Sequence, residues 1–561
     1  MSPPRGALVR ALALLVVLAG SAAGQAPGYD VRGEVFVGSE VERYLRVLQV
    51  AGAAPSYPWA MRGFSPAEVE RLAPVDSAAH PWAGRYRLAA DSAAGVRVAP
   101  VHPEARLVYN SAFPYGGDDG AVWAGRGLTG SVQAGGTVRY GPVSLTVAPV
   151  AFYAGNAGFD LYPNGEQGRL VYADGVRPYL IDLPQRFGDG GYFRVDPGQS
   201  TLRVDGAGVA AGVSTANQQW GPAAFYPILL GNDAPGFPHL FLGTQRPLNV
   251  GLGRIHARLV WGRLGQSDYS TVSPDSANGL MRGLVAAFTP AGVPGLEVGL
   301  ARFHHALWPE EGLRGRQLLT QLEAFLKKDV SDPEDSEVNM IPGNQLASVF
   351  LRWVFPRSGM EVYGEFGRDD HNWDLRDLLL EPDHQSAYLV GLAKVWRPDD
   401  SRFVELRGEV LNAQPSHLSR VRSQGVFYYH TRVRQGHTHR GQLLGSPAVY
   451  GGAGSTVAVN VLDRGGRWSL AWSRELRADD APVMWGYGST SRGVDALHSL
   501  SGEAVRFRGP WELAAGVAGT YDHNRDFARN AFNANLSFSI RTRVGRSDRP
   551  VADGAVVDAQ N

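Results

Sequence analysis

Several long polar segments of the chain place aromatic side chains beside carboxylates, amides and imidazoles. The flat face of a tryptophan or tyrosine can stack on the CH face of a pyranose, and planar polar groups can bind the hydroxyls of the sugar. Aromatic side chains are not needed to make a polar loop soluble, so exposed ones call for an explanation. We therefore predict a glycan-binding surface made of loop residues, with these candidates: Trp373, Asp369, Asp370, His371, Trp485, Tyr487 and Trp308.

A second explanation of the same aromatic residues stays open. They could pack the loops against one another and form a lid over the structure that carries them. Tyr162 and Asn164, within the polar segment 154–199, show the same mixture of groups and the same ambiguity.

Patterns that would support catalysis or metal binding are weak. The sequence contains no G-x-S-x-G, no H-E-x-x-H and no phosphate loop, so we predict no catalytic residues and no enzyme activity. His437 and His439 form an H-x-H pair, and the segment Asp329–Glu337 is rich in carboxylates. The first pattern suits hydrogen-bonded imidazoles, and the second lacks the ligand order of a calcium loop. We therefore predict no metal and no cofactor.

The elements that position these loops are alternating strands. In 403–411, for example, Leu406 and Val410 lie on one face, and Glu405, Arg407 and Glu409 lie on the other, because successive side chains of a strand point to opposite faces. Similar alternation occurs at 361–367, 467–473 and 532–540. Alternation alone does not distinguish a membrane barrel from a soluble all-β protein.

Loop length favours the membrane barrel. Short turns, such as 140–142, 356–359 and 463–466, alternate with long polar segments, such as 154–199, 306–344 and 475–497. Short turns at one rim and long loops at the other are typical of outer-membrane barrels. The many aromatic residues near strand ends and the 70 glycines agree with this prediction. Segment 220–243 is too rich in proline for a spanning strand, and we expect it to fold into or over the lumen.

The N-terminal part of the chain differs from the rest. Residues 1–24 have the basic start, apolar core and small residues of a secretory signal peptide. The spacing of apolar residues predicts a helix over 39–51, and Ser65 with Glu68 forms a capping-box start for a second helix. A third helix is expected around 82–94. We assign 25–104 to a periplasmic helical region, 105–544 to the barrel and 545–561 to a polar tail.

Composition limits the partners. The chain has 54 basic and 54 acidic residues, so nothing indicates a nucleic-acid partner, and it contains no cysteine.

From the sequence itself we count about fourteen strands.

Three motifs resemble the Wzi-type capsule assembly family. They lie at Asn110–Gly127, Gly231–His239 and Arg434–Gly441, in the order that the family shows. This resemblance implies an all-β, eighteen-stranded transmembrane antiparallel barrel with a small N-terminal helical bundle on the periplasmic side. It also implies an outer-membrane lectin that anchors exported capsular or exopolysaccharide at the cell surface.

The expected location is the outer membrane of a Gram-negative bacterium, with loops at the surface, lipid and lipopolysaccharide around the wall, and a monomeric state. The alternative is an outer-membrane porin or sugar-selective channel. The lumen separates the two hypotheses, because a lectin can have a filled lumen and a channel cannot.

Overall fold

The computed structural model describes residues 29–30, 33–74, 80–83, 85–87, 95–272, 278–308, 315–322, 343–369, 375–416, 424–431, 433–478 and 494–542. The signal peptide and the polar tail predicted from the sequence lie outside these ranges.

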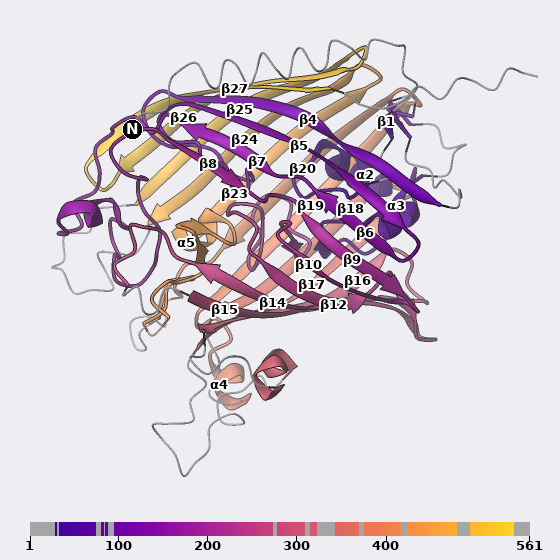
Figure 1. Ribbon diagram of the computed structural model, residues 1–561, viewed down its shortest axis with the longest axis horizontal. Helices are drawn as coiled ribbons and strands as arrows, with labels where there is room; N and C mark the ends of the chain where they lie inside the picture. The colour runs from indigo at the N-terminus through magenta and orange to yellow at the C-terminus, as the bar shows by residue number, and fades with distance from the viewer. Residues whose placement is uncertain are drawn as a thin grey trace, which may run out of the picture.

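Most of the described chain forms one closed antiparallel barrel (Figure 1). Its strand segments, in chain order, are β4 (Val96–Asn110), β5 (Gly127–Tyr140), β6 (Val143–Val147), β7 (Val150–Ala154), β8 (Tyr192–Asp196), β9 (Thr201–Gly206), β10 (Val209–Ser214), β12 (His239–Thr244), β13 (Leu248–Asn249), β14 (Gly253–Gly265), β15 (Asn278–Pro290), β16 (Leu296–Leu307), β17 (Gly343–Phe355), β18 (Met360–Asp369), β19 (Ser386–Asp399), β20 (Arg402–Asn412), β23 (Ala453–Asp463), β24 (Gly466–Ala478), β25 (Asp495–Arg508), β26 (Trp511–Arg525) and β27 (Arg529–Thr542).

These 21 segments make eighteen strands, because three strands are each interrupted once. The segments β6 and β7 both pair with β5, β8 and β9 pair with that interrupted strand, and β12 and β13 both pair with β14. The barrel closes where β27 pairs with β4, with Asn535 opposite Asn110. The sequence count fell short of eighteen, whereas the number implied by the family resemblance is confirmed.

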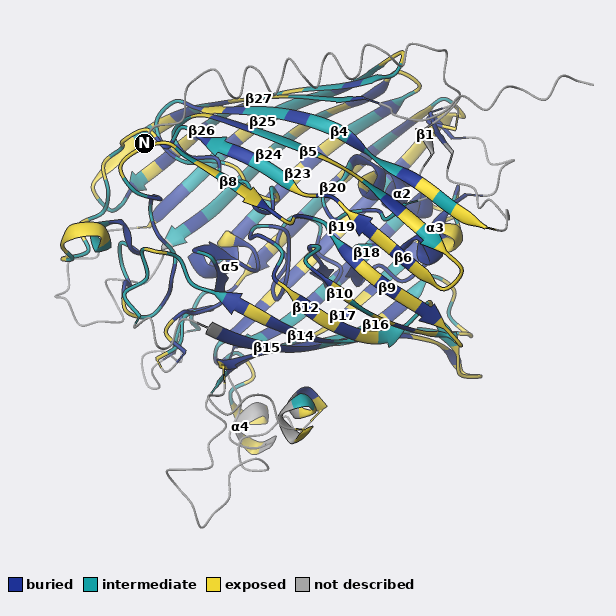
Figure 2. Cartoon of the chain, viewed as in Figure 1, coloured by how far each residue is buried: buried dark blue, intermediate teal, exposed yellow. Residues whose placement is uncertain are grey.

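The barrel wall has its apolar face outward and its charged face inward. In β20, Leu406 and Val410 are 40% and 55% exposed, whereas Glu405, Arg407 and Glu409 are each no more than 5% exposed. Bands of exposed and buried residues alternate along the strands (Figure 2). A barrel in water would bury its apolar face, so this wall is suited to lipid. The alternation predicted from the sequence is confirmed, and the structure decides which face points outward.

The connections between strands differ at the two rims. At the first, which we call the short-turn rim, strands are joined by turns such as 141–142, 356–359 and 464–465. At the second, the long-loop rim, they are joined by segments such as 155–191, 215–238 and 413–452. The predicted loop 154–199 is only partly loop, since it contains a 3-10 helix (Gly168–Tyr172) and β8.

The N-terminal region packs inside the barrel at the short-turn rim. The helix α2 (Glu40–Val50) begins at Ser39, and α3 (Pro66–Leu72) begins at Ser65, whose backbone N–H donates to the Glu68 carboxylate at 2.9 Å. Both helices were predicted and are confirmed. Near them, the indole N–H of Trp82 donates to the carbonyl of Asp463, the last residue of β23, at 2.9 Å.

The predicted third helix around 82–94 is wrong in its described part. A turn is followed there by β3 (Tyr86–Arg87), which pairs with β1 (Tyr29–Asp30). Trp82 packs on the N-terminal helix from this turn, since its ring stacks on Tyr44 of α2 with ring centroids 4.1 Å apart. No helix among the described residues is long and apolar enough to cross a membrane.

The remaining short elements lie in the connections. They are β2 (Met61–Arg62), β11 (Gln219–Trp220), β21 (Thr438–His439), β22 (Gln442–Leu443), α4 (Leu375–Leu380), α5 (Pro447–Gly451) and two 3-10 turns at Gly315–Leu318 and Thr320–Leu322.

Among the inward positions of the wall, Gly391 of β19 lies directly opposite Tyr363 of β18. A Cβ atom at Gly391 would lie 2.0 Å from the tyrosine ring, so glycine is required there for packing.

Candidate functional site

A buried charge network joins α2 to the barrel wall. The carboxylate of Glu361, on β18, is fully buried. It accepts hydrogen bonds from Arg46 of α2 at 3.1 Å, Arg352 of β17 at 2.6 Å and Arg407 of β20 at 2.8 Å. Buried charges are tolerated only when they are paired and hydrogen-bonded. The network therefore fixes the N-terminal helix within the lumen.

Segment 219–238 crosses the lumen beyond α2. The carboxylate of Glu409, on β20, accepts three successive backbone N–H groups of residues 224–226 at 2.6–2.9 Å. Trp220, Tyr226 and Ile228 are buried in the main apolar cluster of the barrel interior. The prediction that this proline-rich segment folds into the lumen is confirmed for its larger part, while its C-terminal end begins the wall strand β12.

Segment 424–452, of which the structure describes all residues but 432, closes the lumen from the long-loop rim. The Tyr428 hydroxyl donates to the carbonyl of Ile228 at 2.6 Å, and a ring nitrogen of His437 lies 2.5 Å from the carbonyl oxygen of Leu229. The backbone N–H of Gly231 donates to the Leu444 carbonyl at 2.7 Å. Together α2 and these two segments occupy the centre of the lumen, with a cavity of about 110 Å³ left beside α2.

Segment 155–191 forms an ordered cap at the long-loop rim. The side-chain amide of Asn156 donates to three carbonyls of residues 187–190 at 2.9–3.1 Å. Asp182, which is 2% exposed, accepts the backbone N–H of Ser267 at 2.6 Å and its hydroxyl at 2.5 Å. Burial raises the pKa of Asp182 to about 6. These contacts fix the cap before any ligand arrives.

The outer face of this cap combines the groups that sugar recognition needs. Tyr179 is 55% exposed, and its hydroxyl donates to the carboxylate of Glu166. Asn164 holds the turn beneath them by donating to the Leu170 carbonyl at 3.1 Å. An exposed ring with a carboxylate at its edge offers one stacking face and one hydroxyl acceptor. Sequence reasoning missed this pair, because the two residues are 13 positions apart and meet only through the fold of the cap.

Comparison with known proteins decides the family. The profile described as capsule assembly protein Wzi matches residues 115–463, which is more than half of the chain. This chain belongs to the Wzi family of capsule assembly proteins. The family resemblance inferred from the sequence motifs is thus confirmed.

Among solved structures, the chain is similar to Wzi of Escherichia coli, described as an outer-membrane protein involved in group 1 capsule assembly and as a carbohydrate-binding β-barrel. The TM-score is 0.57 at 13% sequence identity, covering 91% of this chain and 100% of that one. At this identity the likeness establishes the fold.

Two further solved structures are less similar. OccAB3 of Acinetobacter baumannii has a TM-score of 0.39 at 9% identity, covering 80% of this chain and 98% of that one. OprD of Pseudomonas aeruginosa has a TM-score of 0.37 at 10% identity, covering 81% and 95%. Neither supports an argument about function. No curated protein sequence matches the chain significantly.

Of the loop residues predicted to bind a glycan in this Wzi-family barrel, two are described. Trp308 directly follows β16 and is 39% exposed, as a stacking residue must be. Asp369 ends β18, is only 4% exposed, and accepts the Tyr428 N–H at 2.8 Å, so its carboxylate holds segment 424–452. The others lie outside the described residues: Asp370, His371, Trp373, Trp485 and Tyr487.

The two histidines of the H-x-H pair lie inside the lumen and contact the main chain. His439 accepts the backbone N–H of Gly265 at 3.0 Å, and His437 contacts a carbonyl as described above. Burial lowers the pKa of His437 to about 4. Among the described residues, no group of three or more metal-binding side chains is placed to hold an ion.

Proposed function

We propose that this protein binds exported capsular polysaccharide with the long-loop face of its barrel and thereby anchors the polymer at the surface of a Gram-negative cell. Membership of the Wzi family supports the role in capsule assembly. The related E. coli protein is described as carbohydrate-binding, and the outer face of the cap around Tyr179 offers groups suited to the same task.

The single observation that carries this proposal over the channel alternative is the occupied lumen. Glu361 and Glu409 hold α2 and segment 219–238 across the interior, and segment 424–452 lies over them. A sugar-selective channel needs a continuous aqueous path lined by polar groups. A surface anchor needs only a stable scaffold that presents its loops.

The proposed orientation follows from the rims. Outer-membrane barrels have short periplasmic turns and longer extracellular loops. The long-loop rim would then face the medium, and the N-terminal region at the short-turn rim would face the periplasm. Many weak sites along a polymer suffice for retention, because each bound repeat raises the effective concentration of the next.

A binding measurement tests the proposal. Purified protein in a non-ionic detergent is titrated with short oligosaccharides cut from the capsule of the source strain, so that avidity does not contribute. One stacking contact contributes about 1–2 kcal/mol, so Tyr179→Ala should weaken binding by roughly 5- to 30-fold.

Tyr140 supplies the matched control for that experiment. It is 67% exposed but lies at the short-turn rim, so Tyr140→Ala should bind as the parent does. Absence of any saturable binding by the parent protein would refute the proposal.

A further inference from the structure

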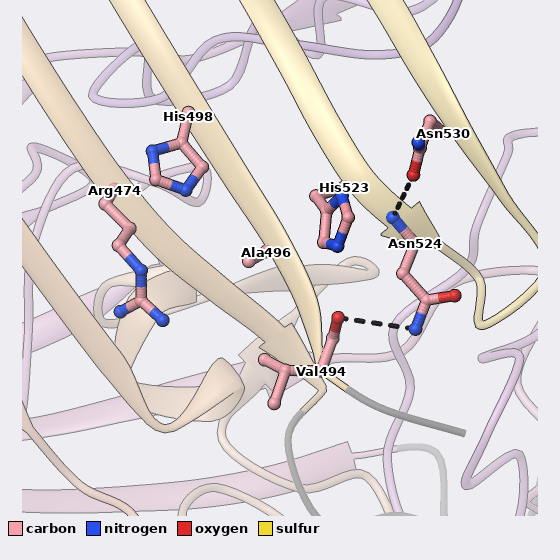
Figure 3. A pocket seen from close by; sticks show the side chains of 7 residues that line it. All are labelled: Arg474, Val494, Ala496, His498, His523, Asn524 and Asn530. Atoms are coloured by element: carbon pink, nitrogen blue, oxygen red, sulfur yellow. Dashed lines mark hydrogen bonds between the residues drawn. The ribbon is translucent and has the colours of Figure 1, made fainter. Parts of the chain in front are cut away.

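A small basic cleft lies on the outer wall of the barrel, at the long-loop ends of β24–β27 (Figure 3). Its volume is about 540 Å³. Arg474, His498 and His523 share the outward strand faces of the exposed Trp472, Leu500 and Tyr521, because side chains two positions apart on a strand lie on the same face, so the cleft opens to the outside of the barrel. Arg474, His498 and His523 project into it from three successive strands, and Asn524 and Asn530 border it.

The sheet register brings these side chains together. Arg474 of β24 is directly opposite His498 of β25, and His523 of β26 is opposite Ala496, two positions from His498. Directly opposed residues on one face have Cβ atoms about 5 Å apart, and diagonal ones about 7–8 Å, so long side chains can converge on one group. Within the described part of the chain, none of these three side chains makes a hydrogen bond or ion pair. The Asn524 N–H donates to the Asn530 side chain at 3.0 Å, which fixes the border of the cleft.

An apolar band lies immediately beside the cleft, further along the wall toward the membrane. Trp472, Leu500 and Phe532 are each more than 40% exposed on this outer face, and the Trp472 ring packs near His498 with centroids 6.2 Å apart. By the alternation of side chains, the outward positions of β24–β27 include no aspartate or glutamate among the described residues. The wall therefore offers unpaired donors and positive charge directly above a lipid-facing surface.

We infer that this cleft binds the phosphorylated headgroup of a glycolipid in the outer leaflet. A guanidinium and two imidazoles match a phosphate, which accepts several charge-assisted hydrogen bonds. The acyl chains of the same molecule would lie on Trp472, Leu500 and Phe532. An anionic polymer in solution would make no use of these apolar neighbours, so the arrangement favours a membrane lipid. The choice of leaflet rests on the orientation given under the proposed function.

The test uses the whole protein in a non-ionic detergent, titrated with diphosphorylated lipid A and, separately, with the same lipid after removal of both phosphates. Binding in detergent depends neither on orientation nor on polysaccharide recognition, so failure here leaves the proposed function standing. We expect the parent to prefer the phosphorylated lipid at least tenfold. The triple variant Arg474→Gln, His498→Gln, His523→Gln should lose that preference and bind both lipids alike.

The matched control is Arg464→Gln with Arg508→Gln, which removes two exposed cations from the short-turn rim of the same strands. It should keep the preference of the parent. Three results would overturn the inference: equal binding of both lipids by the parent, an undiminished preference in the triple variant, or selective capture of a carboxylated polysaccharide at these three residues. The parent comparison needs no variant, so it decides the matter even if the triple variant does not fold.

Discussion

Replacing Glu361 by glutamine should weaken the docking of α2 in the lumen while the barrel stays folded. The fully buried carboxylate accepts from three arginines, and a glutamine keeps one acceptor oxygen and adds donors that face the guanidinium groups. Arg407 would still have Glu405 at 2.7 Å, and Arg46 would keep the Pro222 carbonyl at 2.8 Å. The hydrogen bonds left to Arg352 would be long, to Gln49 at 3.3 Å and the Tyr57 carbonyl at 3.4 Å. Breaking a buried ion pair on one side costs about 3–5 kcal/mol.

Hydrogen–deuterium exchange of the peptide that covers α2 measures this loss directly. A loss of about 3–5 kcal/mol in docking speeds exchange by a factor of roughly one hundred to a few thousand, since about 1.4 kcal/mol is tenfold. Glu70→Gln is the matched control, because Glu70 is 36% exposed and pairs with Arg139 at the surface, where such a pair contributes about 0–1 kcal/mol. Equal protection of α2 in the two variants would refute the reasoning about the network.

Three further predictions follow from packing, protonation and topology. Gly391→Ala should destabilise the barrel by about 1–3 kcal/mol in guanidinium unfolding, because the added methyl group meets the opposite tyrosine ring. Gly408→Ala should cost less, because the nearest atom to its added methyl group is the Thr456 carbonyl oxygen at 4.0 Å, and equal costs would contradict this. The raised pKa of Asp182 means that the folded cap holds a proton that the unfolded chain releases near pH 4. The stability of the cap should therefore be full below pH 4 and fall as pH rises through about 6, so proteolysis of the cap should become faster over this range. Asp182→Asn should abolish this pH dependence, and an unchanged pH profile in the variant would refute the raised pKa of Asp182. An impermeant thiol reagent on intact cells should label Tyr179→Cys but not Gly465→Cys, since the chain has no cysteine of its own, and the reverse pattern would invert the proposed orientation.

The wall of the barrel was predictable because its information is local. The alternation of 403–411 places Glu405 and Leu406 on opposite faces whatever surrounds them. The turn at 464–465 has only two residues, so the sequence itself shows that the two flanking strands are neighbours. The outward direction of the apolar face, and the interruption of three strands, depend on pairing partners far along the chain. Neither feature can be predicted from the alternation of side chains within one strand.

The interior and the cap were harder to predict for the same reason. That Glu409 caps a run of backbone N–H groups near residue 225, or that Glu166 meets Tyr179, follows only from the folded arrangement. For Asp369 the sequence predicted a role in glycan binding that the structure does not support. Its position in a polar segment suggested a ligand, but burial at the end of β18 gives its carboxylate a main-chain partner. In the described part of the helix expected at 82–94, residues 82–83 and 85–87 form a turn and β3 instead, and Trp82 there stacks on Tyr44 of α2.

The central claim is retention of polysaccharide at the cell surface, and the partition of polymer between cells and medium tests it most directly. In a strain that lacks this gene, the parent protein should restore cell-bound capsule. The double variant Trp373→Ala, Trp485→Ala should leave the polymer in the medium while the barrel still inserts and resists heat. A folded double variant that retains as much polymer as the parent would contradict the loop-binding account, and a deletion strain with unchanged retention would contradict the claim itself.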